Sequence, residues 1–234
     1  AKSETTAAGE GDVTKPAMRT RKSPKVDEAF GSATPTAPVS SAVGKGKRGR
    51  STRPFPAGPS EEALEFARGI YNLGSGTPVR RLTLFDHLQR TPDSGTSRML
   101  VTNSNKYGLV RGNYASDQLE LTSEGKKVCD DNTSLREAAR LKAKLAILDI
   151  PPFQALYDKF VNTKLPPRAA LIDSMREAGT EPEYLEEGVD TFIVNLKAIG
   201  LLQNLSGADR VVTVVHLMDT LPRSTQNTVG PPLP

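Results

Sequence analysis

The strongest constraint on the fold of this chain is a long N-terminal stretch without any hydrophobic period. Residues 1–58 are rich in Ala, Gly, Ser, Thr and Pro, and Phe30 and Phe55 are their only aromatic residues. Such a segment buries too little apolar surface to offset the backbone entropy lost on ordering, roughly 1–2 kcal/mol per residue. The sequence therefore predicts a disordered tail over 1–58 and a second flexible tail over 221–234, which leaves 59–220 to fold.

The net charge of +4 is distributed unevenly along the 234 residues. Residues 1–58 hold 11 basic and 5 acidic residues, a balance of +6. Residues 59–130 hold 9 of each, and residues 131–220 hold 10 basic and 13 acidic residues, a balance of −3. The basic character thus belongs to the predicted tail, and the overall charge alone does not make the folded region a polyanion-binding surface.

Within 59–130, apolar residues recur first at helical spacing and then in alternation. Ser60 is suited to cap a first helix, and Gly74-Ser-Gly76 is suited to end it. The sequence predicts three helices, a hairpin and a short closing helix, at 60–73, 79–88, 96–107, 109–111 with 118–121, and 122–128.

The end of the third predicted helix carries a family resemblance. Lys106-Tyr-Gly-Leu-Val110, followed by a hairpin and Leu121-Thr-Ser-Glu-Gly125, resembles the winged helix-turn-helix superfamily. There the third helix ends at a glycine, and an apolar strand, a wing and an "LTxEG" phrase follow. The resemblance implies a mainly α fold with small β-hairpins (α+β), with a first winged helix-turn-helix domain over 59–130.

In winged-helix DNA-binding proteins the third helix enters the major groove and the wing touches the backbone or minor groove. Transferred to this chain, the resemblance implies two groups of DNA-binding residues. Base edges would be contacted by Arg98, Thr102, Asn103 and Asn105, because arginine pairs with guanine and asparagine with adenine. Phosphates would be contacted by Lys106, Arg111, Arg80 and Arg81. The alternative is a solvated helix face with no ligand.

Residues 131–220 repeat the pattern after a connecting helix at 135–148. Helical apolar faces are predicted at 153–160, 167–178 and 182–199, and strands at 201–205 and 211–215. Lys197-Ala-Ile-Gly-Leu-Leu202 again resembles the junction between third helix and wing. The region resembles a second winged helix, and the tandem arrangement resembles an uncharacterised family of prokaryotic proteins.

The second presumed recognition helix is acidic at its N-terminal half. Phosphate would repel such a face, so we expect it to contact a protein partner or a second copy of the chain. The residues predicted for that contact are Glu183, Glu186, Glu187 and Asp190. Alternatively, these carboxylates simply suit the positive end of the helix dipole and keep the helix soluble.

The predicted tail holds a basic cluster that resembles an AT-hook core, in which Arg-Gly-Arg lies along an A·T-rich minor groove. Its basic residues are Lys45, Lys47, Arg48, Arg50 and Arg53. Ser51-Thr52 separate the core from Arg53-Pro54, whereas a full hook has prolines on both sides. Nucleic-acid affinity without sequence specificity is therefore expected, with a nuclear-import signal as an alternative function.

No catalytic, metal-binding or cofactor-binding arrangement stands out, so the sequence predicts a protein that is not an enzyme. His87, His216 and Cys129 show no metal-ligand spacing, and Cys129 is expected to be a small, nearly buried side chain. A lone cysteine forms no intrachain disulfide, and no apolar run approaches the roughly 18 residues of a membrane span. The predicted location is the cytoplasm (nucleoid-associated) in a prokaryote or the nucleus in a eukaryote.

Two functions remain open at this point. The first is a DNA-binding transcriptional regulator or chromosome-associated factor, in which the first winged helix and the tail contact duplex DNA. The second is a non-enzymatic adaptor whose two winged helices dock onto proteins, so that only the tail touches nucleic acid.

Overall fold

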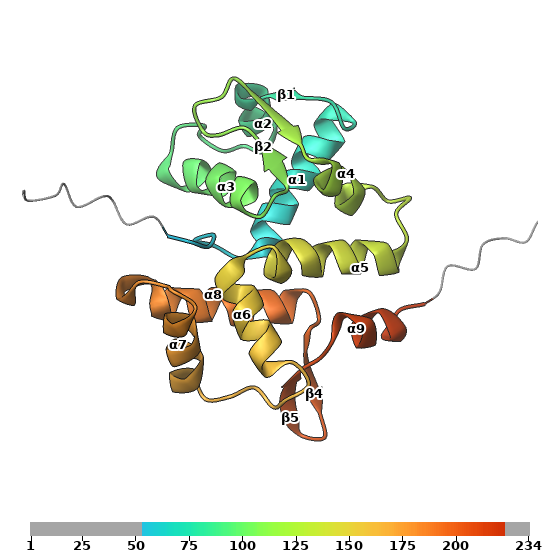
Figure 1. The fold of residues 1–234 in the computed structure, drawn as a ribbon. Coiled ribbons are helices and arrows are strands. Elements are labelled where there is room, and N and C mark those ends of the chain that lie inside the picture. The colour runs from blue at the N-terminus through green and yellow to red at the C-terminus, as the bar shows by residue number, and fades with distance from the viewer. Residues whose placement is uncertain (1–52, 223–234) are drawn as a thin grey trace, which may run out of the picture. The chain divides into compact units, whose positions relative to one another are not determined.

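The computed structural model describes residues 53–222 (Figure 1). This part of the chain is mainly helical, with one three-stranded and one two-stranded antiparallel sheet. The prediction of a mainly α fold with small β-hairpins is therefore confirmed at that level. The predictions for residues 1–52 and 223–234, including Lys45, Lys47, Arg48 and Arg50, lie outside the described residues.

The first region follows the predicted order with one additional strand. Its elements are α1 (Ser60–Gly74), β1 (Val79–Arg80), α2 (Arg81–His87), α3 (Gly95–Lys106), β2 (Val110–Arg111), β3 (Gln118–Leu121) and α4 (Ser123–Cys129). The prediction of a helix from Val79 is wrong, because Val79 pairs with Leu119 and places β1 beside β3 in a β1-β3-β2 sheet. Leu82, whose spacing from Phe85 and Leu88 predicts an apolar position on the same helical face, is 57% exposed.

The second region begins with a connector and ends in an unpredicted helix. Its elements are α5 (Leu135–Ala143), the π-helix η1 (Lys144–Leu148), α6 (Pro151–Phe160), α7 (Arg168–Glu177), the 3₁₀ turn η2 (Pro182–Tyr184), α8 (Leu185–Ala198), β4 (Leu202–Leu205), β5 (Ala208–Val211) and α9 (Val214–Thr220). The strand predicted over 211–215 is wrong beyond Val211. Thr213 caps α9 instead, its hydroxyl accepting a hydrogen bond from the His216 amide at 3.0 Å.

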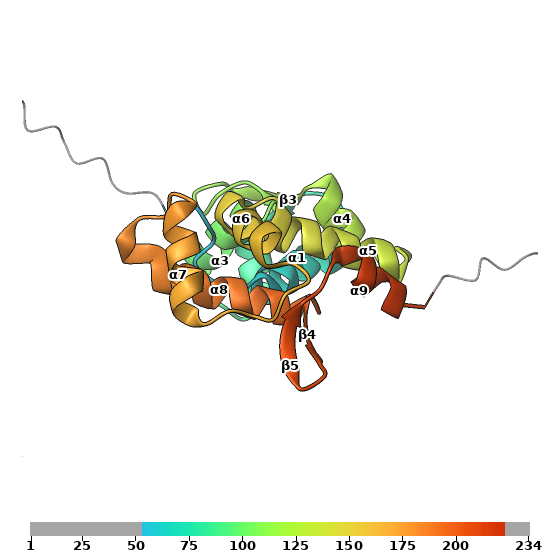
Figure 2. The same ribbon diagram turned by 60° about the horizontal axis from the view of Figure 1, so that its bottom comes forward.

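The two regions repeat one topology. The series α1, α2, α3, β2, β3, α4 corresponds to α6, α7, α8, β4, β5, α9, and a single bridge between Lys164 and Arg210 stands where β1 pairs with β3. Gly108 and Gly200, both at positive φ, join the third helix to the hairpin in the two regions. Thr122 caps α4 as Thr213 caps α9. The β4–β5 hairpin projects beyond the helices (Figure 2).

Residues 53–58, which the sequence prediction assigned to the disordered tail, are packed against the folded core. Phe55 is fully buried, and its ring centroid lies 5.4 Å from that of Phe153 in α6. It also closes over Gly188 of α8, where an added Cβ would lie 2.9 Å from two ring carbons of Phe55. The prediction failed here because a single aromatic residue in a Pro- and Gly-rich stretch has no local period, whereas its pocket is formed by distant helices.

Gly125 in α4 provides a test of the hairpin packing. A Cβ on Gly125 would lie 2.3 Å from the Leu109 carbonyl oxygen, so alanine there must displace the backbone. We expect Gly125→Ala to lower the free energy of unfolding by about 1–3 kcal/mol, measured by urea titration. The matched control is Gly95→Ala at the start of α3, where nothing lies within 4 Å of the added Cβ. Equal stability of the two variants would contradict the packing.

Candidate nucleic-acid interface

α3 presents one face to the core and the other to solvent. Ser94 caps its N-terminus, its hydroxyl accepting from the Ser97 amide at 3.2 Å. The helix packs on α1 through its buried residues, which include Leu100 and Val101. Beyond Thr96, the exposed residues of α3 are Arg98, Met99, Thr102, Asn105 and Lys106. Within Gly95–Lys106 there are two cations and no carboxylate, so no acidic side chain of α3 itself opposes a polyanion.

The exposed face of α3 is joined to the loop of the β2–β3 hairpin. The Asn105 side-chain Nδ2 donates to the carbonyl oxygens of Val110 at 3.1 Å and Gly112 at 3.0 Å. The Arg98 guanidinium lies over the ring of Tyr114, 5.7 Å from its centroid. Both contacts join the helix and the loop into one surface. Asn105, one of the residues predicted to contact a base edge, already uses its side-chain donor group within the protein.

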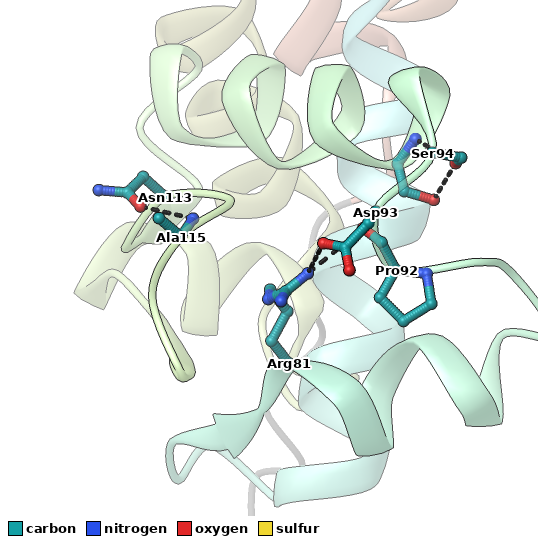
Figure 3. A network of polar contacts seen from close by, with 7 residues as sticks. Arg81, Pro92, Asp93, Ser94, Asn113 and Ala115 are labelled. Carbon is teal, nitrogen blue, oxygen red and sulfur yellow. Dashed lines mark hydrogen bonds and ion pairs between the residues drawn. The ribbon is translucent and has the colours of Figure 1, made fainter. Parts of the chain in front are cut away.

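The loop of the hairpin is shaped by its own polar contacts (Figure 3). The Asn113 side-chain oxygen accepts from the Ala115 amide at 2.8 Å, and the Asn113 amide donates to the Ser116 hydroxyl at 3.0 Å. Arg111 at its base is exposed, as is Tyr114, which is 49% exposed. Neither Tyr114 nor Met99 was predicted as a residue of this surface; an aromatic residue between two predicted strands was the available signal for Tyr114.

Arg81, predicted to reach phosphate, is instead engaged within the protein (Figure 3). Its Nη1 donates to the Pro92 carbonyl oxygen at 3.3 Å and to Asp93 Oδ1 at 3.1 Å. Its backbone amide donates to the Asp117 carbonyl oxygen at 2.8 Å. Arg81 therefore positions the loop before α3 and the end of the hairpin loop, whereas the adjacent Arg80 is exposed and remains available for phosphate contact.

Two further predicted DNA-binding residues hold the N-terminal segment. Asn103 is only 6% exposed, and its Oδ1 accepts from the Ala57 amide at 2.9 Å. Its predicted role at a base edge is therefore wrong in this conformation. Lys106 Nζ donates to the carbonyl oxygens of Arg53 at 2.8 Å and Phe55 at 3.2 Å. Burial, and then the nearby Arg53 charge, lower the pKa of the Lys106 ammonium.

The corresponding asparagine of α8 is also buried within the protein. Asn195 Oδ1 accepts from the Ser60 amide at 2.8 Å, and its Nδ2 donates to the Tyr107 hydroxyl at 3.0 Å. The Tyr107 hydroxyl in turn donates to the Gly58 carbonyl oxygen at 2.7 Å. Desolvation by burial raises the pKa of Tyr107 well above its ordinary value. One face of α8, the third helix of the second region, is thus occupied by the first region.

The acidic residues predicted to contact a partner divide into two groups. Glu183 and Glu186 are exposed. Glu187 instead pairs with Arg53, whose Nη2 lies 2.7 Å from Oε2 and whose guanidinium stacks on Tyr184 at 5.0 Å. Asp190 pairs with Arg168, and that hydrogen bond lowers the pKa of the Asp190 carboxyl. Arg53, predicted to bind DNA with the basic cluster, is therefore tied to α8.

The single cysteine of the chain, Cys129, lies in α4. Cys129 is buried, and desolvation raises the pKa of its thiol to about 11. Among residues 53–222, no group of three or more His, Cys, Asp or Glu side chains is placed to hold a metal ion. No helix in that range is both long and apolar enough to cross a membrane. In comparisons with protein-family models, curated proteins and solved structures, no match to this chain was found.

Proposed function

We propose that this protein binds duplex DNA through α3 and the β2–β3 loop of a winged helix-turn-helix domain. The observation that carries the proposal is the solvent face of α3, where Arg98 and Thr102 lie one turn apart and Arg98 stacks on Tyr114 of the loop. A helix with an exposed arginine and no carboxylate suits the major groove, and an adjoining loop reaches the flanking backbone. The order α1, β1, α2, α3, β2, β3 with the β1-β3-β2 sheet supports this domain type.

The side chains of this surface suit different parts of a duplex. Arg98 offers a bidentate donor pair for guanine, and Thr102 offers a hydroxyl for either base. Met99, 48% exposed beside Arg98, offers an apolar contact for a thymine methyl. Arg80 and Arg111, at the ends of the sheet strands β1 and β2, offer phosphate contacts that fix the register.

The second region would serve a different purpose in this protein. Its third helix, α8, holds three carboxylates against one lysine within Leu185–Ala198, which disfavours phosphate. We assign it, as a second winged helix, to supporting the first region and to contact with a protein partner or a second copy through the exposed Glu183 and Glu186. The role is then that of a transcriptional regulator or chromosome-associated factor, acting where the DNA is, in the nucleoid or the nucleus.

Duplex binding by a variant that lacks residues 1–52 tests the proposal. The deletion keeps Phe55 in its pocket and removes the basic cluster except Arg53. We expect the shortened protein to retain duplex affinity at low salt in a mobility-shift assay. Its salt dependence should be weaker than that of the full chain, by roughly 0.9 in log–log slope for each phosphate that the tail had neutralised.

The adaptor function makes the opposite prediction for the same experiment. It is favoured by the balanced charge of residues 59–130 and by the carboxylates of α8. If the shortened protein folds normally but has no duplex affinity at about 50 mM salt, only the tail binds nucleic acid and the folded regions are adaptors.

A further inference from the structure

We propose that a cavity between the two regions binds a small organic monoanion with a ring-sized apolar body. The cavity has a volume of about 150 Å³ and lies between α1, α5, the ends of α3 and α8, and α4. It shares no residue with the proposed DNA-binding surface of α3, so the inference does not rest on DNA binding.

The inner wall of the cavity is apolar. Leu64 of α1, Val128 of α4, Leu145 of η1 and Ile199 at the end of α8 contribute to it. An apolar protein cavity of this volume is large enough for a single benzene ring. The volume and the apolar part of the lining are therefore compatible with a ring-sized body.

Two cationic side chains from different helices line the same cavity. Lys142 extends from α5 and Arg68 from α1, and among the described residues neither forms an ion pair with a carboxylate. Lys142 is half-buried, and burial followed by the charge of Arg68 lowers the pKa of its ammonium. Lys142 is thus a partly desolvated cation beside the exposed Arg68, and an anion between the two side chains relieves their mutual repulsion.

The π-helix contributes directly to this wall. η1 carries Leu145 and Ala146 into the lining, while Asn195 Nδ2 donates to the Ala146 carbonyl oxygen at 3.3 Å. π-helical turns are rare in proteins and are found frequently at functional sites. Its position at the cavity is thus a second observation, independent of charge, that favours a binding site.

Two carboxylates also line the cavity. Glu65 lies about one helical turn and Glu61 about two turns before Arg68 in α1. They balance the two cations, so the lining carries no net charge, and a single ligand carboxylate is attracted only by the local positive charge of Lys142 and Arg68. A second negative charge on the ligand would meet Glu61 or Glu65 and be repelled. The chemistry points to an aromatic monocarboxylate, whose carboxylate lies between Lys142 and Arg68 and whose ring occupies the apolar wall.

Calorimetric titration of the full chain with benzoate tests the proposal. Benzoate should bind saturably, and it should raise the melting temperature as its concentration exceeds its Kd. Benzamide, which keeps the ring and loses the charge, and acetate, which keeps the charge and loses the ring, should each bind at least about tenfold more weakly. Phthalate, with a second charge, should also bind more weakly.

Variants test whether benzoate binding depends on Lys142 and Arg68 or is non-specific. Lys142→Met and Arg68→Met should each weaken benzoate binding about tenfold and leave the thermal unfolding transition cooperative, because a similar apolar stem remains. Lys127→Met, at an exposed lysine of α4 outside the lining, is the matched control and should bind as the parent does. The proposal is overturned if benzoate does not bind at millimolar concentration, if benzamide binds equally well, or if the cavity variants match the control.

Discussion

Replacing Phe55 with alanine is expected to lower the free energy of unfolding by about 3–5 kcal/mol, the range found for buried phenylalanines. Phe55 is fully buried against Phe153 of α6 and Gly188 of α8, so its truncation leaves a cavity beside these helices. The backbone near Phe55 forms further hydrogen bonds: the Phe55 carbonyl oxygen accepts from the Lys106 ammonium, and the Ala57 amide donates to Asn103 Oδ1. The effect would be large for a residue that the sequence assigns to a disordered tail.

Urea unfolding monitored by circular dichroism measures this change. The matched control is Leu82→Ala, because Leu82 is 57% exposed and its truncation should change the free energy of unfolding by less than about 0.5 kcal/mol. A Phe55→Ala effect below about 1 kcal/mol would show that residues 53–58 do not belong to the folded core. The expected result also means that a tail deletion ending at residue 58 would destabilise the protein. A loss of DNA binding by that variant could then result from unfolding and not from the missing tail.

Replacing Arg98 with alanine in the variant lacking residues 1–52 is expected to weaken duplex binding by about 1–3 kcal/mol, or roughly 5- to 150-fold. Arg98 lies on the solvent face of α3, and within the described residues its guanidinium forms no ion pair, although it stacks on Tyr114. Removing it takes away the side chain best placed to reach a guanine edge.

Two companion variants distinguish base contact from general charge. Arg98→Lys keeps the charge but loses the bidentate geometry, so it should lose sequence preference while keeping most of the non-specific affinity. Arg111→Ala should weaken binding to all sequences and reduce the salt slope by about 1. Fluorescence anisotropy against a selected duplex and a scrambled one, at two salt concentrations, measures both quantities. Equal binding by Arg98→Ala and the parent would remove α3 from the interface.

Local sequence signals predicted most of the helical elements of residues 53–222. α1 followed from its apolar spacing and a glycine stop, although the predicted cap at Ser60 is wrong: Ser60 is the first helical residue, Pro59 precedes it, and no side chain caps the helix. α3 followed from the spacing of its apolar residues and Gly108. β1 and α9 were mis-assigned for a common reason. The apolar runs around Val79 and Val214 suit either a helix or a strand, and the choice depends on pairing with Leu119 and on the Thr213 cap.

The candidate site was predictable only as a set of surface positions. Arg98, Thr102 and Arg111 are exposed, as an amphipathic helix followed by a hairpin implies. Asn103 and Arg53 depart from the prediction because their partners are 46 and 134 residues away in sequence. No local pattern reports that an asparagine amide accepts a backbone hydrogen bond from a distant segment.

Periodicity, capping and composition act over a few residues, so the order of most helices, the two hairpins and the uneven charge follow from the amino-acid sequence alone. Three features depend on tertiary packing: the place where Phe55 packs, the burial of Asn103 and Asn195, and the cavity that Arg68 and Lys142 both line. Burial and ion pairing depend on which surfaces meet in space. That information enters when α8, α1 and residues 53–58 pack together, and no short stretch of the chain carries it.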